Sequence, residues 1–171
     1  TTIKAAAAPL WSAREAAAEA ANLEAWNLRI DEPRNDILVE GYKPAIQKLE
    51  ALIADGPTGY ARSRILLLQT RAALAKGLGY RALRYLKQVD TTTVPTPYYV
   101  TYLEAEAAQM AGQPKRAARL YGRVWKAADH TMLGHIARAK RADAFYIAGD
   151  FDKAEIAYNK ILKRYPEYPR R

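Results

Sequence analysis

Apolar residues recur every three or four positions along most of this chain, which is the period of one face of an α-helix. Between His135 and Tyr168, two such runs are separated by Gly149 and Asp150. Glycine can end a helix in a left-handed conformation, and an aspartate side chain can accept hydrogen bonds from the N–H groups that open the next helix. The pattern therefore predicts a hairpin of two helices, which Pro166 ends.

The second helix of this hairpin has a pattern that also occurs three times upstream. A small residue is followed four positions later by a large one, and three positions after that by another apolar residue. The three columns are Ala45, Ala82, Ala117 and Ala154; Leu49, Leu86, Tyr121 and Tyr158; and Leu52, Val89, Val124 and Ile161. A glycine precedes each of the last three alanines by five residues, at Gly77, Gly112 and Gly149. Because one hairpin cannot bury its apolar face alone, spacings of 37, 35 and 37 residues predict a stack of hairpins.

The last hairpin resembles a tetratricopeptide repeat (TPR). The matching residues, counted from Gly149, are Ala142 and Phe145 before it and Ala154, Tyr158, Ile161 and Pro166 after it. The resemblance covers residues 58–168 and only the second helix of residues 33–55. It implies an all-α solenoid, a right-handed superhelix of about three to four hairpins with an irregular N-terminal one. The first helices depart from the family pattern, with Gln69, Thr101, Glu104, Arg138 and Arg141 at positions where the family has large apolar residues.

We expect one continuous domain with two parts. Residues 1–57 form an alanine-rich helix, which Pro33 ends, and an irregular hairpin in which helix resumes near Pro44. The apolar stripe expected on the first helix is Leu10, Trp11, Ala18, Ala21, Ala25, Trp26 and Leu28. Residues 58–171 form three hairpins at about 58–89, 97–128 and 135–168, the second of which begins with a Thr96 cap and Pro97. The core side of the first of these hairpins comprises Ile65, Leu66, Leu68, Ala72 and Ala73.

The composition of the chain limits which compartments and which kinds of site are expected. The chain has 171 residues, of which 50% are apolar, and no run of about 18 uncharged apolar residues predicts a membrane span. The absence of cysteine excludes disulfides and thiolate sites, and it fits the cytoplasm or the bacterial envelope. Thr1 is not an initiator methionine, so we expect a trimmed fragment or a mature chain. The compartment and the oligomeric state stay open.

The sequence predicts no active site. His130 and His135 are five residues apart and belong to no HExxH motif or comparable ligand cluster, which favours structural or surface roles over metal binding. Ser63 lacks the context of a catalytic nucleophile, and Glu104 and Glu106 lie on different faces of a helix. The expected protein is therefore not an enzyme and uses no metal and no cofactor.

Positive charge is concentrated in the second half of the chain. The net charge of +9 divides into about −3 over residues 1–57, about +8 over 58–129 and about +4 over the remainder. Many of the cations belong to the second helices, namely Arg81, Arg84, Lys87, Lys115, Arg116, Arg119, Arg123 and Lys126. A solvated surface is favoured over a footprint for nucleic acid or anionic lipid.

In the TPR family the first helices line a concave groove that binds a peptide or a helix of a partner. The resemblance places the following residues there: Arg64, Leu67, Arg71, Leu74, Tyr99, Tyr102, Glu106, Gln109, Asp143 and Tyr146. Tyrosine and arginine side chains suit protein recognition, and we expect Tyr102 and Arg71 to be largely exposed. The alternative is that Tyr99 and Tyr102 pack against the neighbouring hairpin. The family's basic and asparagine clamp for a C-terminal carboxylate is not matched, because Leu67 and Arg71 occupy two of its positions.

These observations favour a non-catalytic scaffold that binds a protein or peptide partner within a larger bacterial assembly. One alternative is a helical accessory domain of a bacterial envelope enzyme, peptidoglycan-cleaving or protease, whose catalytic domain lies outside this sequence. A weaker alternative is nucleic-acid or anionic-ligand binding by the basic convex face, which a steep salt dependence of the affinity would reveal.

Overall fold

A computed structural model describes residues 13–164 of the chain, with side chains from residue 19 onward. This part contains eight α-helices and no strand, which confirms the all-α prediction. The helices are α1 (Ala13–Leu38), α2 (Tyr42–Ala54), α3 (Gly59–Ala75), α4 (Gly79–Leu86), α5 (Pro97–Met110), α6 (Pro114–Ala127), α7 (Met132–Ile147) and α8 (Phe151–Arg164).

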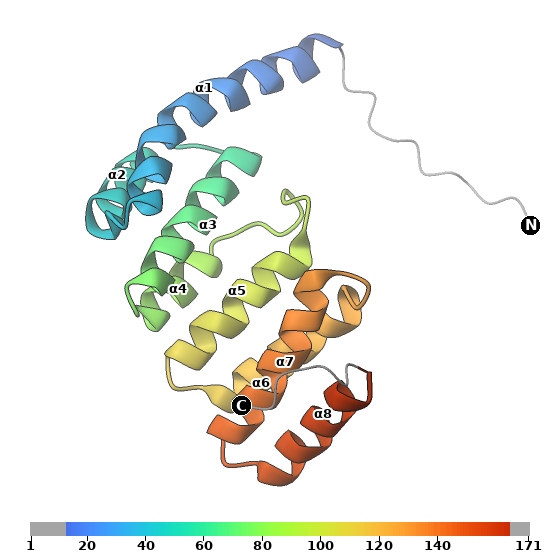
Figure 1. The fold of residues 1–171 in the computed structure, drawn as a ribbon. Helices are drawn as coiled ribbons and strands as arrows, with labels where there is room; N and C mark the ends of the chain where they lie inside the picture. The colour runs from blue at the N-terminus through green and yellow to red at the C-terminus, as the bar shows by residue number, and fades with distance from the viewer. Residues whose placement is uncertain (1–12, 165–171) are drawn as a thin grey trace, which may run out of the picture.

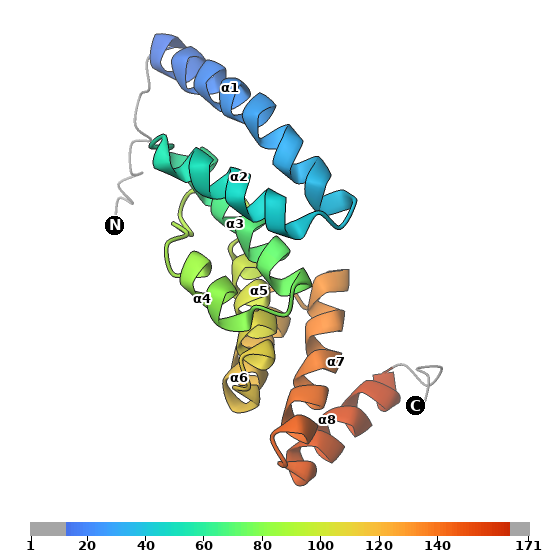
Figure 2. The same ribbon diagram turned by 90° about the vertical axis from the view of Figure 1, so that its left-hand side faces the viewer.

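The helices are stacked in chain order from α1 at one end to α8 at the other (Figure 1), and the view at right angles shows the same order (Figure 2). Each helix packs on the next, and α1 also contacts α3, α3 contacts α5, and α5 contacts α7. Within residues 13–164, no backbone contact joins helices more than two places apart, and even-numbered helices meet one another only through side chains, such as Arg81 on α4 and Glu50 on α2. We call the side of the stack formed by the odd-numbered helices the inner face and the opposite side the outer face.

Three apolar clusters follow one another along the stack instead of one central core. The first joins α1, α2 and α3 through residues such as Ile30, Leu49 and Ile65. The next two use the residues around Leu66 and Leu103 and those around Tyr121 and Val124. Each hairpin therefore buries its apolar surface against its neighbours, as the repeated sequence pattern predicts.

The alanine columns and the turn glycines lie where the sequence predicts. Ala45, Ala82 and Ala117 are 0% exposed and Ala154 is 2% exposed, because two helices approach closely at each of them. The three turn glycines, Gly77, Gly112 and Gly149, have φ angles of 74°, 71° and 74°. Glycine adopts this left-handed conformation without the steric penalty of a side chain, so each glycine lets the chain reverse between two helices.

The N-terminal part differs from the sequence prediction. Pro33 does not end the first helix, since α1 continues through it to Leu38 and the proline ring is fully buried. An internal proline removes only one helical hydrogen bond, and burial of the ring offsets part of that loss. The predicted stripe is also wrong in part, because Ala21, Ala25 and Leu28 are exposed, while Trp26 packs against the first cluster. Leu10, Trp11 and the side chain of Ala18 lie outside the described residues.

Helix boundaries farther along the chain shift by a few residues. Helix α4 ends at Leu86, although Val89 still packs against the second cluster from the following loop. Helix α7 begins at Met132 instead of His135, because the hydroxyl of Thr131 accepts a hydrogen bond of 3.1 Å from the backbone N–H of Gly134. Thr96 occupies the N-cap position of α5, but its side chain makes no capping hydrogen bond. Pro166 and Tyr168 lie outside the described residues.

Candidate binding surface

The residues expected in a groove lie on three successive odd-numbered helices. Helix α3 carries Arg64, Leu67, Arg71 and Leu74, helix α5 carries Tyr99, Tyr102, Glu106 and Gln109, and helix α7 carries Asp143 and Tyr146. Arg71, Asp143 and Tyr146 are exposed, whereas the other seven residues are half-buried. The inner face therefore offers fewer accessible side chains than the sequence predicts.

The two tyrosines of α5 are mainly packing residues. Tyr102 contacts both clusters beside α5 and lies edge-on to the ring of Tyr121, with centroids 5.9 Å apart and planes at 61°. Burial and the nearby Glu106 carboxylate raise the pKa of Tyr102 to about 12. Tyr99 packs against the cluster shared by α3, α4 and α5. The expectation that Tyr102 is largely exposed is wrong, because the adjoining hairpins enclose its ring.

Glu106 links two hairpins across the inner face. Its carboxylate accepts a hydrogen bond of 2.8 Å from the Tyr121 hydroxyl and forms an ion pair of 2.7 Å with Lys140 Nζ on α7. Burial, and then the Glu106 carboxylate, raise the pKa of Tyr121 far above its ordinary value. The last hairpin repeats this tyrosine–carboxylate pairing, since the Tyr158 hydroxyl donates to Asp143 at 2.5 Å. These carboxylates hold helices together and are only partly available to a ligand.

Some of the remaining residues expected in the groove pack against other helices, and others are exposed to solvent. Arg64 donates a hydrogen bond to the side-chain oxygen of Asn27 on α1, and Leu67 and Leu74 pack against the second cluster. Gln109 has a buried side-chain oxygen without a hydrogen-bond partner in the described part of the chain. Tyr146 is 60% exposed, and its ring is edge-on to Phe151 at 5.4 Å.

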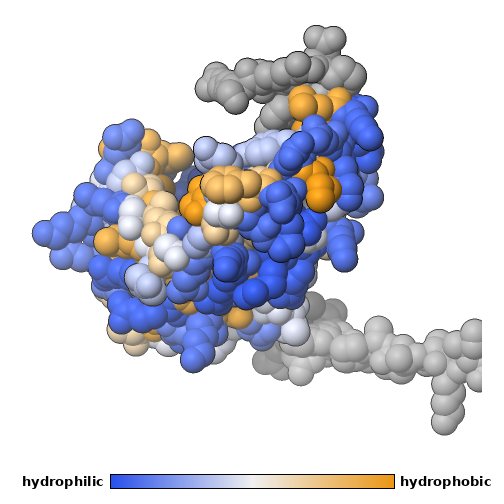
Figure 3. Space-filling model, turned by 90° about the horizontal axis from the view of Figure 1, so that it is seen from below, coloured by the Kyte–Doolittle hydropathy of each residue, from blue (hydrophilic) through white to orange (hydrophobic). Residues whose placement is uncertain are grey.

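The end of the stack at α7 and α8 exposes apolar surface. Figure 3 looks at this end and shows apolar residues gathered between hydrophilic ones. A hollow of about 490 Å³ lies here, and Met132, Ile136, Asp143 and Ile161 are among the residues that line it. Met132 is 74% exposed and Ile147 57%, because no further helix follows α8 within residues 13–164 to cover them.

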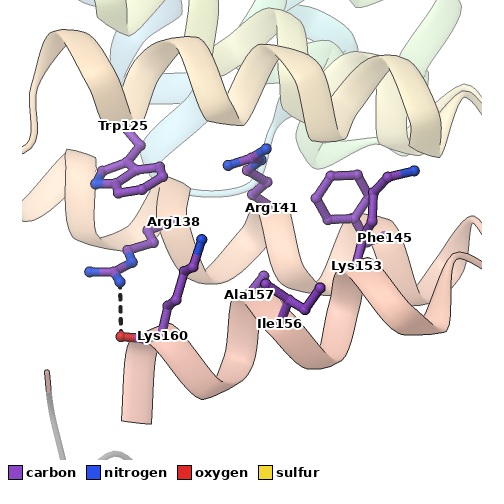
Figure 4. A pocket seen from close by; sticks show the side chains of 8 residues that line it. All are labelled: Trp125, Arg138, Arg141, Phe145, Lys153, Ile156, Ala157 and Lys160. Carbon is purple, nitrogen blue, oxygen red and sulfur yellow. Dashed lines mark hydrogen bonds between the residues drawn. The ribbon is translucent and has the colours of Figure 1, made fainter. Parts of the chain in front are cut away.

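A second pocket, which we call the Trp125 pocket, lies on the outer face between α6 and α8, with α7 as its floor (Figure 4). Its volume is about 130 Å³. Its apolar wall is formed by Trp125, Phe145, Ile156 and Ala157, and its cations are Arg138, Arg141, Lys153 and Lys160. Sequence reasoning missed this site, although it singled out Arg138 and Arg141 as departures from the repeat pattern.

The basic residues of the second helices have different surroundings. Arg81 forms an ion pair of 2.7 Å with Glu50 on α2, and Arg116 forms one of 2.6 Å with Glu104 on α5. The other predicted cations of these segments are exposed: Arg84, Lys87, Lys115, Arg119, Arg123 and Lys126. Part of the outer basic surface thus stabilises contacts between helices, and the rest faces solvent.

No cluster of three or more His, Asp or Glu side chains that could hold a metal occurs among the residues that the structure describes. His130 lies 3.4 Å from the Asp129 carboxylate, and His135 lines the hollow beside α7. Within the same residues, no helix combines the length and the apolar character that crossing a membrane requires.

Comparisons of this chain with protein-family models, with curated proteins and with solved structures find no match.

Proposed function

We propose that this protein is a non-catalytic scaffold, a TPR-like solenoid that binds a peptide or a helix of a partner protein on its inner face. The observation that carries the proposal is the unbroken layer of odd-numbered helices, in which α1, α3, α5 and α7 contact one another in turn. A layer of this kind presents one continuous surface to an extended ligand. Arg71, Asp143 and Tyr146 are exposed on it, and arginine and tyrosine are enriched in protein interfaces.

The half-buried state of Tyr102 decides which residues test this proposal. Replacing Tyr102 would disturb two apolar clusters, so a loss of binding could reflect a loss of folding. Arg71 and Tyr146 are exposed, and their side chains can be removed with little effect on packing.

The first prediction is that Arg71→Ala combined with Tyr146→Ala weakens partner binding by more than about 2 kcal/mol. A partner captured from a lysate of the source organism and then purified provides the ligand, and calorimetry measures its affinity. The matched control is Arg119→Ala with Arg123→Ala, two exposed residues of α6 on the outer face, which should leave the affinity nearly unchanged. Weakening by the control pair alone would place the site on the outer face and contradict the proposal.

The alternative function, an accessory domain of an envelope enzyme, differs from an independent scaffold in requiring a catalytic domain outside this sequence. A catalytic motif of an envelope enzyme in the full-length gene would favour the accessory domain, and its absence would favour an independent scaffold.

A further inference from the structure

The Trp125 pocket holds four cationic side chains and no acidic one among the described residues that line it. Lys153 has a counter-ion outside the pocket, because its Nζ lies 2.5 Å from the Asp150 carboxylate. Arg138 donates a hydrogen bond of 2.8 Å to the backbone oxygen of Lys160. The Nε atom of Arg141 is buried and has no hydrogen-bond partner among the residues that the structure describes. The pocket therefore lacks the negative charge that would balance it.

In the preceding hairpin, the residues equivalent to Arg141 and Lys153 have opposite charges. Glu104 and Arg116 stand 37 residues before Arg141 and Lys153, and they form an ion pair of 2.6 Å between α5 and α6. In the last hairpin Arg141 stands in place of the glutamate, so this ion pair is absent, and Arg141 and Lys153 each lie near the Phe145 ring, 5.2 Å and 5.9 Å from its centre. Lys153 therefore has no carboxylate from α7 at the position where Arg116 has Glu104, and an anionic ligand could supply one.

Aromatic rings hold the cations in place. The guanidinium carbon of Arg138 lies 4.9 Å from the centre of the Trp125 ring, and that of Arg141 lies 5.2 Å from the Phe145 ring. Gly122 on α6 makes room for Arg141, because a Cβ atom there would lie 3.2 Å from Arg141 Nε. A guanidinium stacked on a ring keeps the N–H donors at its edge available, so the arginines are oriented for an anion before it binds.

The arrangement of charge and apolar surface indicates what the pocket accepts. Figure 4 shows Arg138 and Lys160 at one end, Lys153 at the other, and Ile156 and Ala157 between them on α8. The volume of about 130 Å³ is close to the roughly 150 Å³ of an apolar cavity that takes up benzene, so one apolar side chain fills it. A chain of phosphates has no group that would occupy this apolar centre.

From this geometry we propose that the Trp125 pocket binds an acidic peptide segment of a partner protein, with one apolar side chain inserted between flanking carboxylates. The carboxylates pair with Arg138 and Lys160 at one end and with Arg141 and Lys153 at the other. The site is separate from the inner face, because Arg141 and Asp143 are two residues apart on α7 and thus roughly 200° apart around the helix. Binding here and binding on the inner face are therefore tested by different variants.

The test titrates the full chain with a capped Glu-Glu-Phe-Glu-Glu peptide and follows binding by calorimetry. Replacing the glutamates of the peptide with glutamines should weaken binding by about tenfold or more, as expected for the loss of charge-assisted hydrogen bonds. The variants Arg141→Gln and Lys160→Gln should each weaken binding of the acidic peptide by about tenfold.

Two controls distinguish specific binding in the Trp125 pocket from nonspecific electrostatic attraction to a basic protein. Lys163→Gln changes the same charge on the same exposed part of α8 outside the pocket, and it should alter the affinity by less than about twofold. Because Lys160 is exposed, its variant tests the site even if Arg141→Gln fails to fold. No binding of the acidic peptide, equal effects of Lys160→Gln and Lys163→Gln, or tighter binding of an oligothymidylate would overturn the proposal.

Discussion

At the scale of single residues, the buried alanines decide how closely the helices approach. Ala154 is 2% exposed in the last hairpin, at the position where Ala117 is fully buried in the preceding one. We predict that Ala154→Leu lowers the free energy of unfolding by roughly 1 to 3 kcal/mol, because the larger side chain separates α7 and α8. Asn159→Leu adds a similar side chain to an exposed position of α8 and should change the stability little. Equal effects of the two changes in urea unfolding would contradict this role of the alanine column.

The buried phenols predict a loss of stability at alkaline pH. Tyr102 has a pKa of about 12, above the value of about 10 for an unfolded tyrosine, and the pKa of Tyr121 is raised as well. The folded state thus holds these protons more tightly, so its advantage is complete below pH 10 and is lost as the pH rises through 12. Allowing for solvent screening, we expect the free energy of unfolding to fall by about 1 kcal/mol or more between pH 9 and 11.5.

Because lysines also titrate in this range, a comparison of variants isolates the tyrosines. Tyr121→Phe should make the free energy of unfolding depend less steeply on pH above 10, whereas Tyr80→Phe, at a position 66% exposed, should leave the slope unchanged. Urea titrations at each pH provide the measurement. The same slope in both variants would show that the buried phenols do not cause the alkaline loss.

The structural roles of residues that recur at a fixed spacing could be predicted from the sequence. The roles of residues that depend on contacts with other hairpins could not. Ala82 and Gly112 belong to columns that recur at a fixed spacing, so their burial or backbone conformation followed from the sequence alone. Tyr102 resembled an exposed interface residue, but the ring of Tyr121 and two clusters enclose it. The Trp125 pocket could not be predicted, because the proximity of Arg141 to the rings of Trp125 and Phe145 depends on the fold, although the sequence does show the reversal of charge from Glu104 to Arg141.

At the scale of helices, the boundaries depend on contacts that local propensity does not include. The break predicted at Pro33 is absent because the ring of that proline is fully buried. The hydroxyl of Thr131 caps α7, so this helix begins at Met132, three residues before the predicted start at His135. The pairing of helices could be predicted, since it depends on short turns with glycine.

The last helix should be the least protected from hydrogen exchange. Within residues 13–164, helix α8 packs only on α7, whereas α5 packs on four other helices. Opening α8 therefore exposes less apolar surface than opening α5, and its amides should exchange faster. Hydrogen exchange followed by mass spectrometry can compare the two helices in the full chain. Equal protection of α5 and α8 would contradict an open stack and indicate a further contact that covers α8.

At the scale of the whole molecule, the two faces carry different chemistry. On the inner face, Glu106 and Asp143 are already hydrogen-bonded to tyrosines, and Arg71 and Tyr146 are accessible. On the outer face, the Trp125 pocket lies beside the exposed cations of α6. If both proposals hold, one chain can hold two protein segments on opposite sides, and the linker between the segments sets how strongly they bind together.

The restriction of contacts to helices at most two places apart also determines how the molecule responds to a pulling force. Tension applied to the two ends of the stack acts on one hairpin interface after another, because no contact between the described helices spans its length. Each hairpin that gives way should release roughly 35 residues, or about 120 Å of extended chain, in a separate step. Between loaded attachment points the protein would therefore lengthen stepwise and take up slack again as the hairpins refold, in the manner of a molecular spring.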